Sequence, residues 1–181
     1  MSKAHSAAAH RALQVQFADK CAMQSSLSDI HEVSGAYGLA YLAHWAVLET
    51  FVKQLSITYE RAKLQADLLK WAEFMNGASV VRPTELSTAK YKPDTFLNAP
   101  LPSRKQLALL ITVDQAPTFH LVLDPDQRYR KRRNAIAHSG ESVSVKVYED
   151  FKAAVQVAIA EINSWLYLDV ITGETSGHIA D

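Results

Sequence analysis

The stretch YGLAYLAHWAVLETFVKQL, residues 37–55, decides the fold class. Its large side chains recur every three or four residues, at Tyr37, Tyr41, His44, Leu48, Phe51 and Leu55, and Trp45 and Val52 widen the stripe. This period matches the turn of an α-helix, so the stretch predicts an amphipathic helix that packs against a core.

Helical patterns also flank this stretch. On its N-terminal side, residues 12–23 predict a short helix after a loose terminus over about 1–10. On its C-terminal side, residues 64–75 repeat the apolar stripe, and Asn76-Gly77 predicts where that helix ends. Residues 78–102 then contain four of the six prolines and predict a long loop.

The second half of the chain contains two helix starts and a closing helix. Ser103 predicts an N-cap for residues 104–113, and Asp124-Pro125-Asp126 predicts the start of a helix that ends at Ser139-Gly140. Residues 148–166 carry the last apolar stripe, followed by a frayed tail over about 172–181. We therefore predict one all-α domain over residues 1–181, an up-and-down bundle of four to five helices.

Composition restricts the classes of function. The 19 basic and 19 acidic residues cancel, so any affinity for nucleic acid must come from a local patch. The single cysteine, Cys21, cannot form an internal disulfide and favours a reducing, cytoplasmic setting. Neither a signal peptide nor an apolar run of about 20 residues is present, so we expect no membrane contact. No metal or other cofactor is expected.

One segment, RYRKRRNAIAHSG over residues 128–140, is dense enough in charge to form such a patch. On a helix with about 100° per residue, Tyr129 and Ile136 face the core, and Arg133 lies about 40° from Tyr129 at the border of the apolar face. Arg133 and His138 lie about 140° apart, so one straight helix cannot direct both at one small ligand. A helix that ends near His138, or a second copy of the chain, would bring them together.

This basic cluster has a structural and a functional interpretation. Basic residues near a helix C-terminus complement the helix dipole, and a run of charge is commonly a solvated face. A cation at the border of an apolar face, however, needs a partner or a purpose, and Arg133 is such a cation. Functionally, His138 could move a proton of a ribose 2′-hydroxyl while Arg133 holds the phosphate. That chemistry needs no metal, leaves a 2′,3′-cyclic phosphate and spares DNA.

The string Arg133-Asn134-Ala135-Ile136-Ala137-His138, with Gly140 after it, resembles the signature of the HEPN superfamily, small helical domains of which many are RNases. The resemblance extends over about residues 30–168 and implies a homodimer whose two motifs form one composite cleft. It implies that Arg133 binds phosphate, His138 serves as acid or base, and Asn134 orients them. It also implies that RNA approaches along Arg128, Arg130, Lys131 and Arg132.

Proteins of this kind typically act in toxin–antitoxin or anti-phage defence systems. Those controlled by a nucleotidyltransferase antitoxin often carry a tyrosine two residues after the histidine, where this chain has Gly140. That control is therefore not expected, and any antitoxin or regulatory protein stays unidentified.

Two other interpretations of the basic cluster stay open. The domain could be a catalytically silent HEPN-like module that binds nucleotide, RNA or a protein, or a structural dimer in which Arg133 forms an interface ion pair. Outside the cluster, His44 predicts a satisfied core or interface histidine, with a supporting role near the cleft as the alternative. His120 falls in a stretch that reads as a loop and predicts no metal site.

Overall fold

A computed structural model describes residues 3–83 and 101–172, and within them the side chains of 15–56, 67–83, 101–103 and 105–163. These residues form helices and no strands, which confirms the predicted all-α fold. The described helices number six rather than four or five: α1 (Lys3–Val33), α2 (Tyr37–Met75), α4 (Arg104–Leu110), α5 (Pro117–Leu123), α6 (Arg128–Ser139) and α7 (Val145–Thr172). Most of the predicted loop and tail lie outside the described residues.

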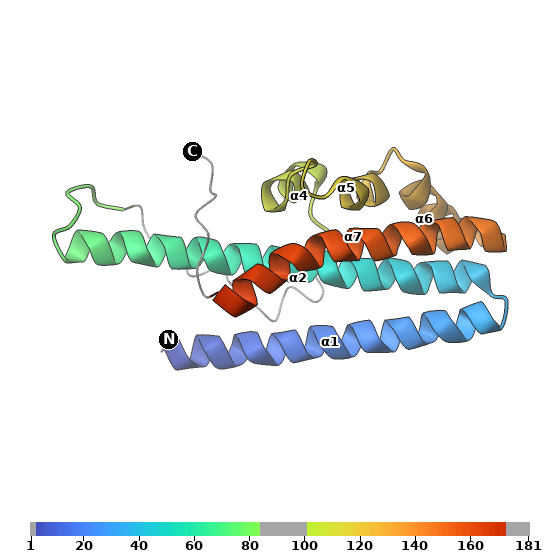
Figure 1. Ribbon diagram of the computed structural model, residues 1–181, viewed down its shortest axis with the longest axis horizontal. Coiled ribbons are helices and arrows are strands. Elements are labelled where there is room, and N and C mark those ends of the chain that lie inside the picture. The colour runs from blue at the N-terminus through green and yellow to red at the C-terminus, as the bar shows by residue number, and fades with distance from the viewer. Residues whose placement is uncertain (1–2, 84–100, 173–181) are drawn as a thin grey trace.

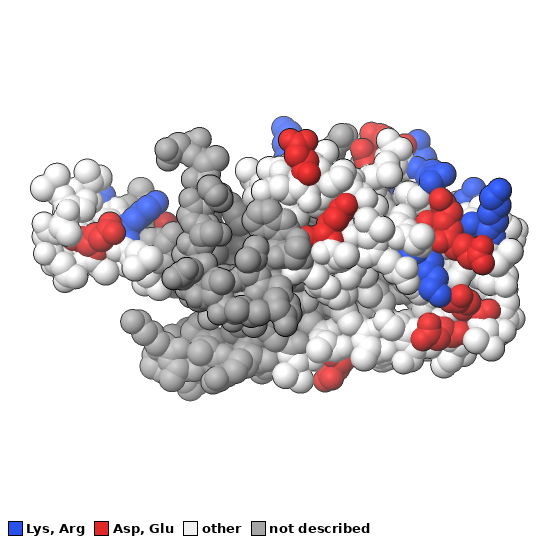
Figure 2. Space-filling model, in the orientation of Figure 1, with Lys and Arg blue, Asp and Glu red and all other residues white. Residues whose placement is uncertain are grey.

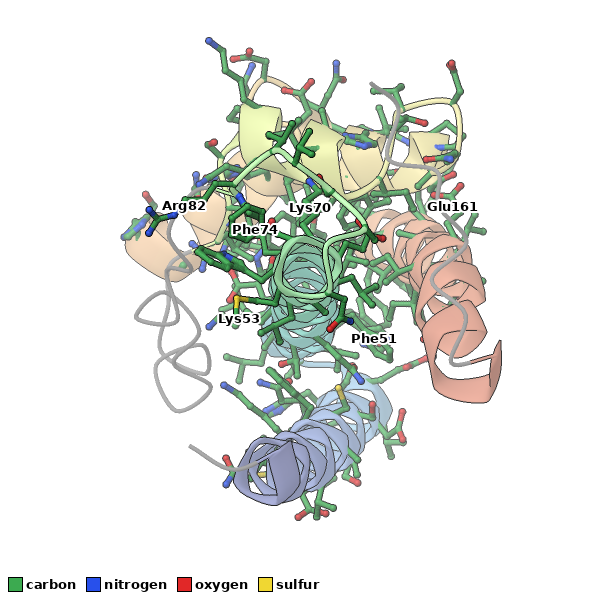
Figure 3. The ribbon with its side chains drawn as sticks, turned by 90° about the vertical axis from the view of Figure 1, so that its left-hand side faces the viewer. Phe51, Lys53, Lys70, Phe74, Arg82 and Glu161 are labelled. Atoms are coloured by element: carbon green, nitrogen blue, oxygen red, sulfur yellow. The ribbon has the colours of Figure 1, made fainter. Side chains whose placement is uncertain are left out.

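Helix α2 forms the centre of the bundle (Figure 1). Helix α1 runs back along one side of it, α7 lies alongside it, and the short helices α4 and α5 cover the side opposite α1 (Figures 1 and 3). Helix α6 lies at the end of the bundle where α1 turns into α2 and where α7 begins (Figure 1). In the described part of the chain, no helix is long and apolar enough to cross a membrane.

The two N-terminal helices are longer than predicted. Instead of a loose terminus and a short helix, α1 runs from Lys3 to Val33, because no glycine or proline interrupts it. It ends where Gly35 adopts a φ of 74° and the backbone N–H of Ala36 bonds to the carbonyl of His31 at 2.8 Å. The two helices predicted over 37–55 and 64–75 are one, since residues 56–63 also lack a breaker. The predicted end at Asn76 is confirmed.

The short helices α4 and α5 begin at caps of different origin. The cap of α4 is local in sequence, and the cap of α5 comes from a distant helix. Ser103 caps α4 as predicted, with a reciprocal bond to Gln106. The segment around His120 is the helix α5 and not a loop. The carboxylate of Glu161 on α7 accepts hydrogen bonds from the first backbone N–H groups of α5, those of Thr118 at 3.2 Å and Phe119 at 2.8 Å (Figure 3). This cap comes from more than 40 residues away, so local sequence does not reveal it.

The predicted start of the basic helix is wrong by a few residues. Asp124 closes α5 instead of opening α6, and its carboxylate accepts a hydrogen bond from the backbone N–H of Asp126 at 2.9 Å. This bond stabilises a turn, so α6 begins only at Arg128. The predicted end is confirmed, because Gly140 closes α6 with a φ of 64°.

The core joins α2 to the helices that follow it in sequence. The ring of Tyr41 on α2 stacks on Phe151 of α7, with 3.6 Å between ring centroids. The Tyr41 hydroxyl is buried, which raises its pKa, and it donates to the backbone oxygen of Tyr129 on α6 at 2.8 Å. The contiguous apolar core includes side chains of α2, α4, α5, α6 and α7, but none from the described part of α1.

Candidate functional site

Helix α6 carries the predicted site and is anchored through its apolar face. Tyr129 and Ile136 are buried, as their helical spacing predicted. The hydroxyl of Tyr129 also donates to the carboxylate of Asp150 on α7 at 3.1 Å. These contacts fix the rotation of α6 about its own axis, and they decide which polar side chains point outward.

Arg133 leaves the border of this apolar face and reaches α2. Its Nη2 lies 3.4 Å from Oε1 of Glu49, and its Nη1 donates to Oδ1 of Asn134 at 3.1 Å. The indole N–H of Trp45 donates to the same oxygen of Glu49 at 2.7 Å. The guanidinium carbon of Arg133 lies 5.9 Å from the centroid of the Trp45 ring. Glu49 is thus the partner that a cation at this border needs, while the Arg133 side chain stays 32% exposed.

His138 occupies the last turn of α6 and is exposed. The helix continues through Ser139, so an early helix end does not turn His138 towards Arg133. Asn134 lies one turn before His138 and is also exposed. The structure therefore brings Arg133 to Asn134, and it keeps His138 about 140° around the helix from Arg133.

Most of the arginines of the basic cluster are engaged within the chain. The acidic partners are Asp150 for Arg128 at 3.0 Å, Glu141 for Arg132, and Glu49 for Arg133. In space-filling view, acidic and basic side chains are interspersed at the end of the molecule where α6 and the start of α7 lie (Figure 2). The basic cluster thus attaches α6 to its neighbours, and its net positive field is smaller than its sequence indicates.

Arg130 and Lys131 are the members of the cluster that form no ion pair with another described residue. Arg130 donates to the backbone oxygen of Leu123 at 3.1 Å, a neutral partner. Lys131 is exposed. These two residues are therefore the best-placed cations of the cluster for an external phosphate.

A second polar cluster lies where α1, α2 and α7 meet, and we name it the junction cluster: Ser28, Glu32, His44, Tyr148 and Lys152. Ser28 Oγ is hydrogen-bonded to Nδ1 of His44 and lies 3.3 Å from the Tyr148 hydroxyl. Tyr148 donates to Glu32 at 2.8 Å, and Lys152 pairs with Glu32 at 2.6 Å. His44 thus has a hydrogen-bond partner inside the bundle, as its position on the apolar stripe predicted. It faces α1 and α7 rather than α6.

The surroundings of the junction cluster shift three of its ionisable groups. Burial, with the nearby Lys152 ammonium, lowers the pKa of His44, and burial raises the pKa of Tyr148 to about 12. Hydrogen bonds from Lys152 and Tyr148 lower the pKa of Glu32. A serine beside a histidine can act as a nucleophile, but the Ser28 hydroxyl donates to the backbone oxygen of Ala40 and Ser28 is 0% exposed, so the pair is not placed to attack a substrate.

Sequence reasoning missed the junction cluster, because its members come from three helices and no local motif joins them. Among the described residues, no three His, Cys, Asp or Glu side chains lie close enough together to hold a metal ion. His120, for which the sequence predicted no metal site, lies on α5. Its Nε2 lies 2.8 Å from the backbone oxygen of Ile111, and this contact ties α5 to the end of α4.

Comparison with known proteins found no matching family model, no matching curated protein and no matching solved structure. The resemblance to the HEPN superfamily therefore depends on the residues of α6 themselves and stays a prediction.

Proposed function

We propose that the chain is a metal-independent endoribonuclease that works as a dimer and acts as a toxin or anti-phage defence effector. The observation that carries the proposal is the setting of Arg133, Asn134 and His138. One short helix presents all three, with His138 exposed and Arg133 held by Glu49 and Trp45 of the central helix. A guanidinium fixed in this way binds phosphate with less loss of side-chain freedom than a mobile one.

Arg133 keeps donors for a ligand. A guanidinium carries five N–H groups, and the contacts to Glu49 and Asn134 use one hydrogen of Nη2 and one of Nη1. The remaining N–H groups can donate to the oxygens of a phosphodiester while Glu49 keeps its place. The paired state of Arg133 is therefore compatible with phosphate binding.

A second copy is part of the proposal for a geometric reason. Because α6 is regular as far as Ser139, Arg133 and His138 of one copy point to different sides. If the α6 helices of two copies face each other, the histidine of one copy can approach a phosphate held by Arg133 of the other. In this arrangement one His138 accepts the proton of the 2′-hydroxyl, and the other protonates the leaving 5′-oxygen. The 2′-oxygen bonds to phosphorus as the bond to the 5′-oxygen breaks, which leaves a 2′,3′-cyclic phosphate and a 5′-hydroxyl.

The test is cleavage of single-stranded RNA by the purified chain in EDTA, with DNA of the same sequence as a control. We expect His138→Ala to lower the rate by about 100-fold or more, the usual effect of losing a general acid–base group. The control variant is His31→Ala, which lacks a histidine of α1. It is expected to cleave RNA at the rate of the wild type. Intact RNA with the wild type, or equal cutting by His138→Ala, would contradict the proposal.

A catalytically silent module that binds nucleotide, RNA or protein is the second candidate function. The observation that favours it is that Arg128, Arg132 and Arg133 all have carboxylate partners, as expected of a structural role. A silent binder of RNA would lose affinity on a double reversal, Arg130→Glu with Lys131→Glu, and would not respond to His138→Ala. A nuclease would bind RNA in the His138→Ala form without cutting it.

A further inference from the structure

The C-terminal half of α1, residues 21–33, has an unusual distribution of side chains. Its apolar residues face solvent: Met23 is 57% exposed, Leu27 42% and Ile30 62%. Its inward face is polar, with Ser28 fully buried and Glu32 partly buried. Hydrophobic burial, the usual force that holds a helix on a bundle, therefore contributes little here.

Hydrogen bonds and one ion pair hold this half of α1 in place instead. Beyond the junction cluster, the hydroxyl of Thr50 on α2 donates to Oε1 of Gln24 at 3.0 Å. Ser28 also donates to the backbone oxygen of Ala40 at 3.2 Å, and Lys152 of α7 pairs with Glu32. Among the contacts of this half of α1, the bond between Ser28 and His44 involves a histidine, whose charge changes most readily near neutral pH.

We infer that residues 21–33 form a proton-sensitive strap, which is closed on α2 and α7 while His44 is neutral and opens when His44 is protonated. His44 of α2 lies beneath the strap and contacts both neighbouring helices: its Nδ1 bonds to Ser28 of α1, and its ring and that of Tyr148 of α7 form an edge contact with 5.8 Å between centroids.

Whichever ring nitrogen carries the first proton, a second proton places a positive charge under the closed strap. The imidazolium would be a partly buried cation near a second cation, Lys152. The carboxylates of Glu32 and Asp29 on α1 and the backbone carbonyl of Ala40 on α2 oppose this effect. Glu32, however, is already engaged by Lys152 and Tyr148. Glu49, on α2, is engaged with α6 on another side of its helix.

The sign of the pH dependence follows from these contacts. Burial and Lys152 lower the pKa of His44 from its ordinary 6.5, so the closed form binds fewer protons than the open form. The contribution of neutral His44 to closure is therefore fully present above pH 6.5 and is lost as the pH falls through the lowered pKa of the closed form. The equilibrium constant for opening rises by at most about tenfold for each pH unit in that window.

The chain supplies its own reporter of opening, because Cys21 is its one cysteine and lies partly buried on the strap. The experiment measures how fast a neutral aromatic disulfide labels Cys21 between pH 7.5 and 5.0, relative to a peptide of residues 15–27. We expect the relative rate to rise several-fold on acidification in the wild type and to stay flat in His44→Gln, whose amide is not protonated. His31→Gln is the matched control, because it removes a neighbouring histidine outside the cluster, and it is expected to behave like the wild type.

A flat wild-type rate would overturn the inference, and so would an equal rise in His44→Gln. If circular dichroism shows that His44→Gln does not fold, hydrogen exchange of the wild type at the two pH values decides instead. After correction for the intrinsic exchange rate, peptides of residues 21–33 should lose protection at pH 5.0 while peptides of residues 148–162 keep it. Equal loss in both segments, or no loss in either, would refute the strap.

Discussion

The contact between Glu49 and Arg133 carries the proposed function, so its strength is the most informative quantity to measure. The perturbation is a double-mutant cycle of Glu49→Ala, Arg133→Ala and the two together. The cycle isolates the interaction between the two side chains from the other effects of each substitution. One of those effects is the loss of the acceptor of the Trp45 indole N–H in Glu49→Ala.

The magnitude follows from the geometry. At 3.4 Å and an effective dielectric constant of about 20, the Coulomb attraction is about 5 kcal/mol before any cost of desolvation. The two side chains are 32% and 25% exposed, so partial desolvation and loss of side-chain freedom cancel most of it. We expect a coupling of about 1 kcal/mol, at the upper end of exposed ion pairs and below the usual range of hydrogen bonds to charged groups.

Urea unfolding followed by far-ultraviolet circular dichroism measures the free energy of unfolding of each variant. The matched control is the pair of Arg132 on the same helix and Glu141 just after it, whose side chains are 38% and 41% exposed. Its coupling is expected to be about 0.5 kcal/mol or less and to disappear in high salt. A coupling between Glu49 and Arg133 that equals zero, or that disappears in salt like the control, would refute the idea that α2 fixes the guanidinium.

Three further predictions concern other parts of the fold. Glu161→Ala removes the distant cap of α5 and is expected to lower the free energy of unfolding by about 1–2 kcal/mol in urea titrations. Gly140→Ala puts a side chain at a φ of 64° with no other atom within 4 Å, so backbone strain alone is expected to cost about 1 kcal/mol and to lower the melting temperature. Glu32 has a lowered pKa, so the stability it contributes is present above its ordinary value of 4.5 and is lost as the pH falls through the lowered value. Unfolding curves of Glu32→Gln should show less of this acid dependence than the wild type.

The sequence predicted which residues make up the candidate site, but it did not predict which of them contact one another. Helical spacing placed Tyr129 and Ile136 on the buried side of α6 and Arg133 at its border. Spacing could not identify Glu49 as the partner, because 84 residues separate it from Arg133. The charge run in turn predicted a basic surface, whereas carboxylates of α2, α7 and the segment after α6 neutralise much of it.

The sequence by itself determined that the chain is helical and where several helices end, since apolar period, caps and glycines act within a few residues of one another. It also determined that one segment combines arginines, an asparagine and a histidine. Only the tertiary structure decided the existence of α5, the pairing of Arg133 and the polar junction under α1. The physical reason is that hydrogen bonds and ion pairs depend on distance in space, and the decisive ones join residues as far apart as Glu32 and Lys152, 120 positions along the chain.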